Sequence, residues 1–132
     1  DAGILCAAVA DFTPDHTADH KIKRGKDGMT IQLKPTKDIA ASLGATKKEG
    51  QVLVGFALET NDEQQNAKGK LERKNFDFIV LNSLNDKGAG FRVDTNKISI
   101  IDRQDTTSYP LKNKSEVAKD IIDRLVQTLN KN

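Results

Sequence analysis

The sequence predicts an α/β layered fold with a mostly parallel sheet, helices on both faces of that sheet and a β-hairpin flap. Largely apolar runs at 4–10, 52–57 and 77–81 are typical of strands that are covered on both faces. Segments with helix-capping signals or helical spacing of apolar residues follow these runs. Strands that alternate with helices favour parallel pairing, because each helix carries the chain back to the same edge of the sheet.

The first third of the chain is expected to supply one strand and the flap. We expect the strand at 4–10, where every residue is apolar or small. The residues at 21–24 and 29–33 are expected to pair across a glycine-containing turn. The segment at 15–35 is therefore predicted to form a flap over the strand ends.

Two helices are predicted in the middle of the chain. Thr36 is expected to cap a short helix at 37–43, and Gly44 is expected to end it. Thr60 is followed three residues later by a glutamate, which is the spacing of a capping box. A second helix should therefore begin there and run to about residue 73.

The last third is expected to hold a loop, a hairpin and a helix. An Asn- and Gly-rich loop is predicted at 82–90, and strands at 97–101 and 106–111 should form a late hairpin. Ser115 is expected to cap a final helix. One face of that helix is apolar at helical spacing: Val117, Ala118, Ile121, Ile122, Leu125 and Leu129.

Length and composition limit the class of protein. A chain of 132 residues should form a single domain, 1–132, with an aliphatic core because aromatic residues make up only 5%. A net charge of +2 is too small to argue for nucleic acid as a partner, and no apolar stretch approaches the roughly 20 residues that span a bilayer. The single cysteine fits a cytoplasmic protein. Because a core run begins almost at Asp1 without an initiator Met, we interpret the chain as a fragment that lacks N-terminal sequence.

Polar residues mark a candidate binding rim. Asp11, Glu59 and Asn82 each come just after a predicted strand, and ligands of parallel sheets bind beyond the carboxyl ends of the strands. The Asp11 carboxylate could hold a sugar hydroxyl or a magnesium ion, or simply cap a turn. Backbone amides at the start of the short helix, 37–40, could hold an anion or a base edge.

Clustered cations point to a phosphorylated small molecule. Lys21, Lys23 and Arg24 lie in the predicted flap, and Lys70 and Lys74 share one helix face because they are four residues apart. Ammonium and guanidinium groups supply charge and donors that phosphate oxygens accept. The alternative for both groups is a solvated surface.

Two other kinds of site are weaker candidates. His16 and His20, with neighbouring aspartates, have a spacing that would suit zinc on a helix, but Pro14 opposes a helix there. Cys6 is expected to be a buried structural thiol in the first strand. The sequence contains no G-x-S-x-G, P-loop or G-x-G-x-x-G motif.

Six segments, ordered along nearly the whole chain, resemble one family. They are A-A-V-A-D-F at 7–12, K-I-K-R at 21–24, T-K-D-I at 36–39, G-F-A-L-E-T at 55–60, K-L-E-R-K-N-F-D-F-I-V-L-N at 70–82 and G-F-R-V-D-T-N at 90–96. Each motif alone is weak, but the ordered set resembles phosphopantothenoylcysteine synthetase, the ligase of coenzyme A synthesis. In bacteria this ligase is commonly the C-terminal half of a protein that also carries a flavin-dependent decarboxylase. The resemblance implies a Rossmann-like fold.

The resemblance implies a nucleotide-dependent ligation. CTP would activate the carboxylate of 4′-phosphopantothenate as an acyl cytidylate, pyrophosphate would leave, and the amine of cysteine would attack the acyl group. Mg²⁺ is the implied cofactor and CTP the co-substrate, whereas FMN would belong only to the fused decarboxylase half. The full-length protein would be a homodimer that binds these small molecules, with neither nucleic acid nor a membrane as a partner.

The resemblance also implies roles for individual residues. Lys21 would be the catalytic flap lysine that closes over the reacting phosphate and carboxylate. Asp11 would hold the ribose or the magnesium ion. The other nucleotide-binding residues would supply backbone groups, helix-start amides, an aromatic contact and further positive charge: Leu5, Cys6, Ala7, Lys37, Asp38, Ile39, Ala40, Phe56, Lys70 and Lys74.

The chain departs from the family's pattern in two segments. Pro35 stands where the family has a lysine before the threonine, and Arg92 and Val93 replace a small pair in the later loop. The family's N-terminal portion, with its glycine-rich nucleotide segment, is absent, so the fragment alone is expected to be inactive. The alternative interpretation is a non-catalytic nucleotide-binding or dimerisation module.

Overall fold

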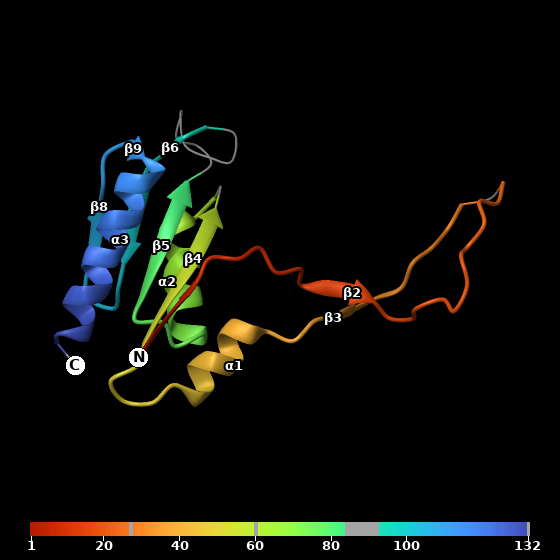
Figure 1. Ribbon diagram of the computed structural model, residues 1–132, viewed down its shortest axis with the longest axis horizontal. Helices are drawn as coiled ribbons and strands as arrows, with labels where there is room; N and C mark the ends of the chain where they lie inside the picture. Colours follow the sequence, from red (N-terminus) through yellow and green to blue (C-terminus); the bar gives the residue numbers. More distant parts are fainter. Residues whose placement is uncertain (27, 60, 84–92, 132) are drawn as a thin grey trace. The chain divides into compact units, whose positions relative to one another are not determined.

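The computed structural model describes residues 1–26, 28–59, 61–83 and 93–131 (Figure 1). The chain divides into two compact units, a larger one of Asp1–Cys6 with Ala40–Asn132 and a smaller one of Ala7–Ile39. Among the described residues, no helix has both the length and the apolar character that crossing a membrane requires.

The larger unit is built on a five-stranded mixed sheet. The strands, in spatial order, are β1 (Ala2–Leu5), β4 (Val52–Glu59), β5 (Phe78–Ser83), β7 (Ile98–Ile101) and β8 (Thr106–Ser108). The pairs β1–β4 and β4–β5 are parallel, whereas β5–β7 and β7–β8 are antiparallel. The α/β class is confirmed, with the parallel strands in the part of the sheet where strands alternate with helices.

Helices cover both faces of this sheet, as predicted (Figure 1). α3 (Lys114–Leu129) packs on one face, and α2 (Glu63–Arg73) packs on the other. Each helix buries its apolar side chains in a different cluster: Val117 and Ile121 of α3, and Ala67 and Leu71 of α2. Because successive strand residues point to opposite faces, β4 and β5 feed both clusters, which explains their nearly continuous apolar runs.

The starts of α2 and α3 differ from the predicted caps. Asp62 is the N-cap of α2, so Glu63 is the first helical residue rather than the third, and Thr60 lies outside the described residues. Asn113 is the N-cap of α3, and its backbone N–H donates to the Glu116 carboxylate at 3.2 Å. Ser115, the predicted cap, therefore lies inside the first turn.

The first strand is shorter and begins earlier than predicted. β1 ends at Leu5, so the expected strand at 4–10 is wrong beyond its first two residues. Cys6, expected to be buried in that strand, is exposed. The run that follows consists mostly of alanines, whose small side chains gain little from burial, so apolar composition alone does not extend the strand.

Gly44 lies inside α1 (Ile39–Thr46) rather than at its end. A Cβ atom at Gly44 would lie 2.0 Å from the backbone oxygen of Lys74. The carbonyl oxygen of Gly44 also accepts a hydrogen bond from the Asn75 side-chain amide at 3.0 Å. The predicted helix-ending role is therefore wrong, and the missing side chain instead lets α1 approach the end of α2.

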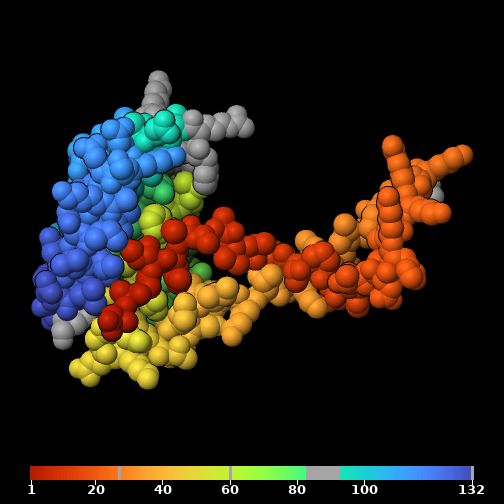
Figure 2. Space-filling model, in the orientation of Figure 1, coloured from red at the N-terminus to blue at the C-terminus, as the bar shows by residue number. Residues whose placement is uncertain are grey.

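The smaller unit contains a two-stranded antiparallel ribbon. β2 (Phe12–Pro14) pairs with β3 (Leu33–Pro35). An antiparallel ribbon is therefore present, but β2 precedes the expected flap at 15–35, and the predicted pairing of 21–24 with 29–33 is wrong. Apart from Leu33 of β3, those segments have no regular structure among the described residues, and most side chains of this unit are exposed (Figure 2).

Thr36 fastens this ribbon and does not cap α1. Its hydroxyl donates to the carbonyl oxygen of Ala10 at 2.6 Å, and its backbone N–H donates to the carbonyl oxygen of Asp11 at 2.9 Å. The hydroxyl therefore serves the base of the hairpin rather than the helix amides.

The end of the chain agrees with the predicted order of elements. The late hairpin is confirmed as β7 and β8. A second small sheet pairs β6 (Thr95–Asn96) with β9 (Lys112–Asn113) in antiparallel fashion. The predicted loop at 82–90 lies mostly outside the described residues, as does Arg92.

The close approach at Gly44 generates a stability prediction. Gly44→Ala should lower the free energy of unfolding by about 1–3 kcal/mol, because the new methyl group would overlap a backbone oxygen. Gly69→Ala in α2 is the matched control, since its Cβ would meet only the flexible end of Arg73. That change should stabilise by about 0.5–1 kcal/mol through helix propensity. Urea unfolding measures whether each substitution raises or lowers the free energy of unfolding. Stabilisation by Gly44→Ala would refute the close contact.

Candidate functional site

The carboxyl ends of β4 and β5 form the rim at which the sequence places a ligand. The strand register pairs Leu58 with Asn82 and Glu59 with Ser83. Glu59 and Asn82 therefore lie at the same edge of adjacent strands, as their positions after predicted strands indicate. Asp11, the third residue expected at this rim, belongs to the smaller unit.

Glu59 holds the ammonium group of Lys70 at this rim. The Glu59 Oε1 atom lies 2.6 Å from Lys70 Nζ, and the two side chains are 15% and 35% exposed. Asn66 donates to the other Glu59 oxygen at 3.4 Å and to the carbonyl oxygen of Asn61 at 3.0 Å. The sequence identified Lys70 as a candidate but missed its partner, because Glu59 and Lys70 belong to different elements and share no periodic spacing.

A second polar contact lies at the same strand ends but on the α3 face of the sheet, because Asn82 alternates with Val80 on that face, whereas Glu59 alternates with Ala57 on the α2 face. The Asn96 side-chain amide donates to Asn82 Oδ1 at 3.0 Å, and Asn96 Oδ1 accepts from the backbone N–H of Lys97 at 3.0 Å. Asn96 comes from β6, at the start of the segment that leads back into the sheet. The rim therefore carries amide groups as well as the Glu59–Lys70 pair.

Lys74 lies at the other end of α2 from the helix start. It is the C-cap residue, and its backbone N–H donates to the carbonyl oxygen of Lys70 at 3.0 Å. Its own backbone oxygen faces Gly44. The ammonium of Lys70 contacts Glu59 at the end of β4, whereas the backbone of Lys74 lies at the turn into β5. A shared role of the two cations in nucleotide binding stays a prediction.

The predicted residues at the first two strands lie in different environments. Leu5 pairs with Gly55 and packs at the margin of the cluster under α2. Phe56 packs at the margin of the cluster under α3. Gly55 has no room for a side chain, because a Cβ there would lie 2.2 Å from the Phe76 ring. Cys6 is exposed just beyond the end of β1.

Most of the remaining predicted residues belong to the smaller unit. Lys21 and Asp11 are exposed there. α1 begins at Ile39, so Ile39 and Ala40 lie at its start as expected, whereas Lys37 and Asp38 precede it. The predicted convergence of Lys21 with Lys70 and Lys74 therefore stays a prediction. The other predicted residues of this segment are exposed or, for Ala40, half-buried: Ala7, Lys37, Asp38, Ile39 and Ala40.

The zinc alternative finds little support in the described residues. His16 Nε2 lies 3.3 Å from Asp15 Oδ2 in an exposed position. Nowhere in the described ranges do three His, Cys, Asp or Glu side chains gather as a metal site would require. The surroundings of the histidines in the described part of the chain therefore do not support a metal site.

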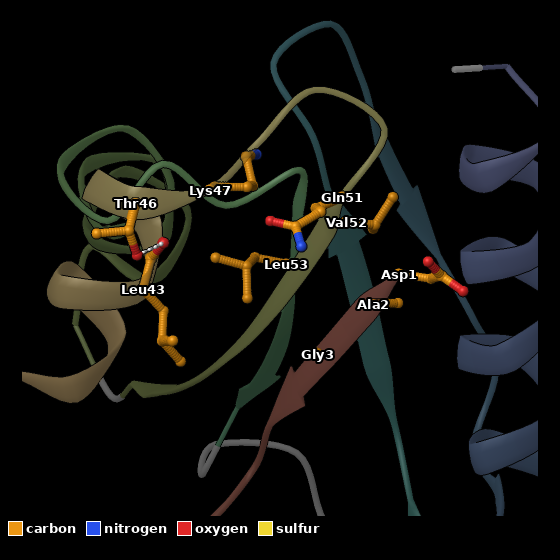
Figure 3. Close-up of a pocket in the computed structure, with 9 residues that line it drawn as sticks. All are labelled: Asp1, Ala2, Gly3, Leu43, Thr46, Lys47, Gln51, Val52 and Leu53. Carbon is orange, nitrogen blue, oxygen red and sulfur yellow. Dashed lines mark hydrogen bonds between the residues drawn. The ribbon is translucent and has the colours of Figure 1, made fainter.

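A cavity of about 210 Å³ lies at the opposite ends of the parallel strands from the rim. It is bounded by the start of β1, the start of β4 and the end of α1, with Gly3, Leu43 and Thr46 among its walls (Figure 3). None of the predicted nucleotide-binding residues lines this cavity. Its position at the amino ends of parallel strands is not where such sheets bind their ligands.

Two groups with shifted pKa values lie away from the Glu59–Lys70 pair. Partial burial favours a higher pKa for Asp102, but backbone N–H groups of Asp105 and Gln104 and the Arg124 guanidinium together lower that pKa below its usual value. The hydrogen bond to Asp120 raises the pKa of Lys112. Asp102 pairs with Arg124 and Lys112 pairs with Asp120, and these contacts hold α3 to neighbouring segments, so we assign both shifts to structure rather than to chemistry.

Comparison with known proteins agrees with the fold. Residues 1–129 match the family model of the DNA/pantothenate metabolism flavoprotein C-terminal domain. The coenzyme A biosynthesis bifunctional protein CoaBC of Bacillus subtilis strain 168 is 45% identical over 95% of this chain and 31% of that protein. A solved C-terminal domain of CoaBC covers the whole chain and 56% of its own, with a TM-score of 0.78 and 32% identity.

One curated relative has a different name. A cysteine/cysteine sulfinic acid decarboxylase of an unknown prokaryotic organism is 60% identical over 96% of this chain and 35% of that protein. The chain thus spans about a third of the length of the curated relatives it matches. The match over 1–129 and the resemblance to the C-terminal domain of CoaBC confirm the family that the six motifs indicate. The chain belongs to the family of DNA/pantothenate metabolism flavoprotein C-terminal domains, which includes the phosphopantothenoylcysteine synthetase part of CoaBC.

Proposed function

We propose that the full-length protein ligates cysteine to 4′-phosphopantothenate in coenzyme A biosynthesis. CTP activates the pantothenate carboxylate as an acyl cytidylate, pyrophosphate leaves, and the cysteine amine attacks the acyl carbon. This chain supplies much of the nucleotide site. The observation that supports the proposal is that Lys70, a predicted nucleotide ligand, lies at the carboxyl rim of the parallel strands in a chain of this family.

The proposed reaction brings two phosphorylated molecules together, so the site must offset their repulsion. Lys70 at the rim and exposed Lys21 in the smaller unit are the cations assigned to that task. Positioning and electrostatic stabilisation of the departing pyrophosphate would supply much of the rate.

Mg²⁺ is proposed as the cofactor, and Asp11 is the residue proposed to hold it. The Asp11 side chain is exposed, and its carboxylate makes no hydrogen bond or ion pair with any described residue. Carboxylate oxygens are hard ligands of the kind that Mg²⁺ prefers. When bound, the ion would neutralise part of the negative charge of the triphosphate.

Two alternative functions, a decarboxylase and a non-catalytic binding module, have less support than the ligase. The relative named as a decarboxylase is matched over about a third of its length, so its name describes far more protein than this chain. A non-catalytic binding module would need the same rim but no flap lysine. Steady-state kinetics of a flap variant therefore separates a ligase from a binding module.

The first functional prediction concerns Lys21. In the full-length protein, Lys21→Gln should lower kcat about 10²–10³-fold, the effect of removing one donor to charge that develops in the transition state. KM for CTP should change by less than about threefold, because the flap contact acts mainly in the reaction itself. Lys23→Gln, in the same segment, is the matched control. An unchanged kcat in the Lys21→Gln variant would show that Lys21 has no catalytic role.

The second prediction concerns nucleotide binding by α2. Calorimetry of the full-length protein with CTP, ATP, UTP and GTP in the presence of Mg²⁺ should find CTP bound most tightly. Lys70→Ala and Lys74→Ala should each weaken CTP binding by about tenfold at low salt and less at high salt, because salt screens these contacts. Lys68→Ala on exposed α2 surface is the control. If neither variant loses CTP affinity, both lysines are solvated surface residues with no role in nucleotide binding.

A homodimer is proposed for the full-length protein, with support from the smaller unit. Several large apolar side chains of that unit are 57–63% exposed: Val9, Phe12, Ile22, Met29, Ile31 and Leu33. Apolar groups gathered on one segment gain free energy when a second copy covers them. Sedimentation should show a dimer that Ile31→Ser weakens and Leu111→Ser, exposed in the larger unit, does not. A monomer at micromolar concentration would exclude the dimer.

A further inference from the structure

We propose that Glu59 is a positioning residue that directs the ammonium of Lys70 toward a bound nucleoside triphosphate. This inference rests on the proposed function, because it takes the rim as the nucleotide site. It gives a role to Glu59, which the sequence places at the rim without one. The observations that carry it are the contacts, burial and donor geometry of the Glu59–Lys70 pair.

The ammonium of Lys70 keeps donors available while it is held in place. A lysine ammonium has three N–H donors, and Glu59 Oε1 accepts one of them at 2.6 Å. Among the described residues, no other protein atom accepts from Lys70 Nζ. Two donors can therefore point at phosphate oxygens without breaking the contact to Glu59.

Lys47 of the larger unit is less exposed than Lys70 and is used differently. Lys47 Nζ donates to the Asn75 carbonyl oxygen at 2.9 Å and to both Asp77 carboxylate oxygens at 2.9 and 3.0 Å. That ammonium is fully engaged, and it lies at the amino edge of the sheet. Lys70 thus differs from Lys47 in two ways: its ammonium keeps N–H donors available, and it lies at the carboxyl ends of the strands. Both differences favour Lys70 as a ligand-binding cation.

Glu59 is itself fixed, so it can transmit a fixed orientation. Its side chain is only 15% exposed at the end of β4, and Asn66 contacts its second oxygen at 3.4 Å. A flexible lysine loses rotamer freedom when it binds phosphate, and a tether that has already ordered it removes part of this entropic cost. The same carboxylate becomes repulsive to a triphosphate once Lys70 is absent, because its charge is then uncompensated.

A double-mutant cycle on the full-length protein tests this pairing. CTP affinity in the presence of Mg²⁺ is measured by calorimetry for the wild type, Glu59→Ala, Lys70→Met and the double variant. We expect each single change to weaken binding about tenfold. In the Lys70→Met background, Glu59→Ala should leave affinity unchanged or raise it, because it removes a carboxylate that repels the triphosphate.

Glu59→Gln provides the conservative variant. It keeps an acceptor oxygen for Lys70 and should hold CTP affinity within about threefold of the wild type. Asp77→Asn, which alters the ion pair at the opposite edge, is the control for a purely structural effect. It should lower the melting temperature without changing CTP affinity in the folded protein.

The outcomes distinguish this inference from the proposed function. Equal losses from Glu59→Ala in both backgrounds, or no loss in a folded Glu59→Ala variant, would overturn the positioning role while leaving the nucleotide site intact. Absence of CTP binding by the wild type, or no effect of Lys70→Met, would overturn the proposed function and this inference with it. Melting temperatures of all variants establish that each one is folded.

Discussion

The parallel pairing of β4 with β5 is the interaction on which the rest of the larger unit depends. Val52 and Val54 of β4 and Phe78 and Val80 of β5 are fully buried, so this pair of strands is the centre of the apolar core. Both faces must then be covered, and α2 and α3 cover one face each. The same register that buries these residues also ends β4 at Glu59, next to the point where β5 ends. The position of the rim is therefore a consequence of core packing.

Two residues without side chains permit this packing. Gly55 leaves space above β4 for the Phe76 ring, and Gly44 lets α1 contact the end of α2. Protein interiors are densely packed, so a methyl group at either position would push the elements apart. These contacts hold the loop between α2 and β5 and, through β5, the strand that borders Glu59. The geometry of the rim thus depends on close approaches at the far side of the molecule.

The sequence predicts the elements whose signal is local and misses those that tertiary contacts decide. Apolar runs identify β4 and β5, and helical spacing identifies α3, because burial on a defined face repeats with a fixed period. Thr36 and Gly44 resemble helix-capping residues, but their hydroxyl and missing side chain serve contacts with distant segments. The Glu59–Lys70 pair shows the same limit: motifs pointed to Lys70, yet its partner follows from how α2 returns along β4.

The state of Lys70 also bears on how the rim would attract a triphosphate. Its positive charge is already compensated by Glu59 in the free protein, so the rim gains little from net charge. A neutral pair costs less to desolvate than an isolated ammonium, and it still presents N–H donors of fixed direction. Affinity would then depend on the geometry of the donors, and the preference would be for phosphate oxygens that meet them. This explains how a chain with a net charge of only +2 can be proposed to bind a polyanion: the selectivity resides in local arrangement rather than in total charge.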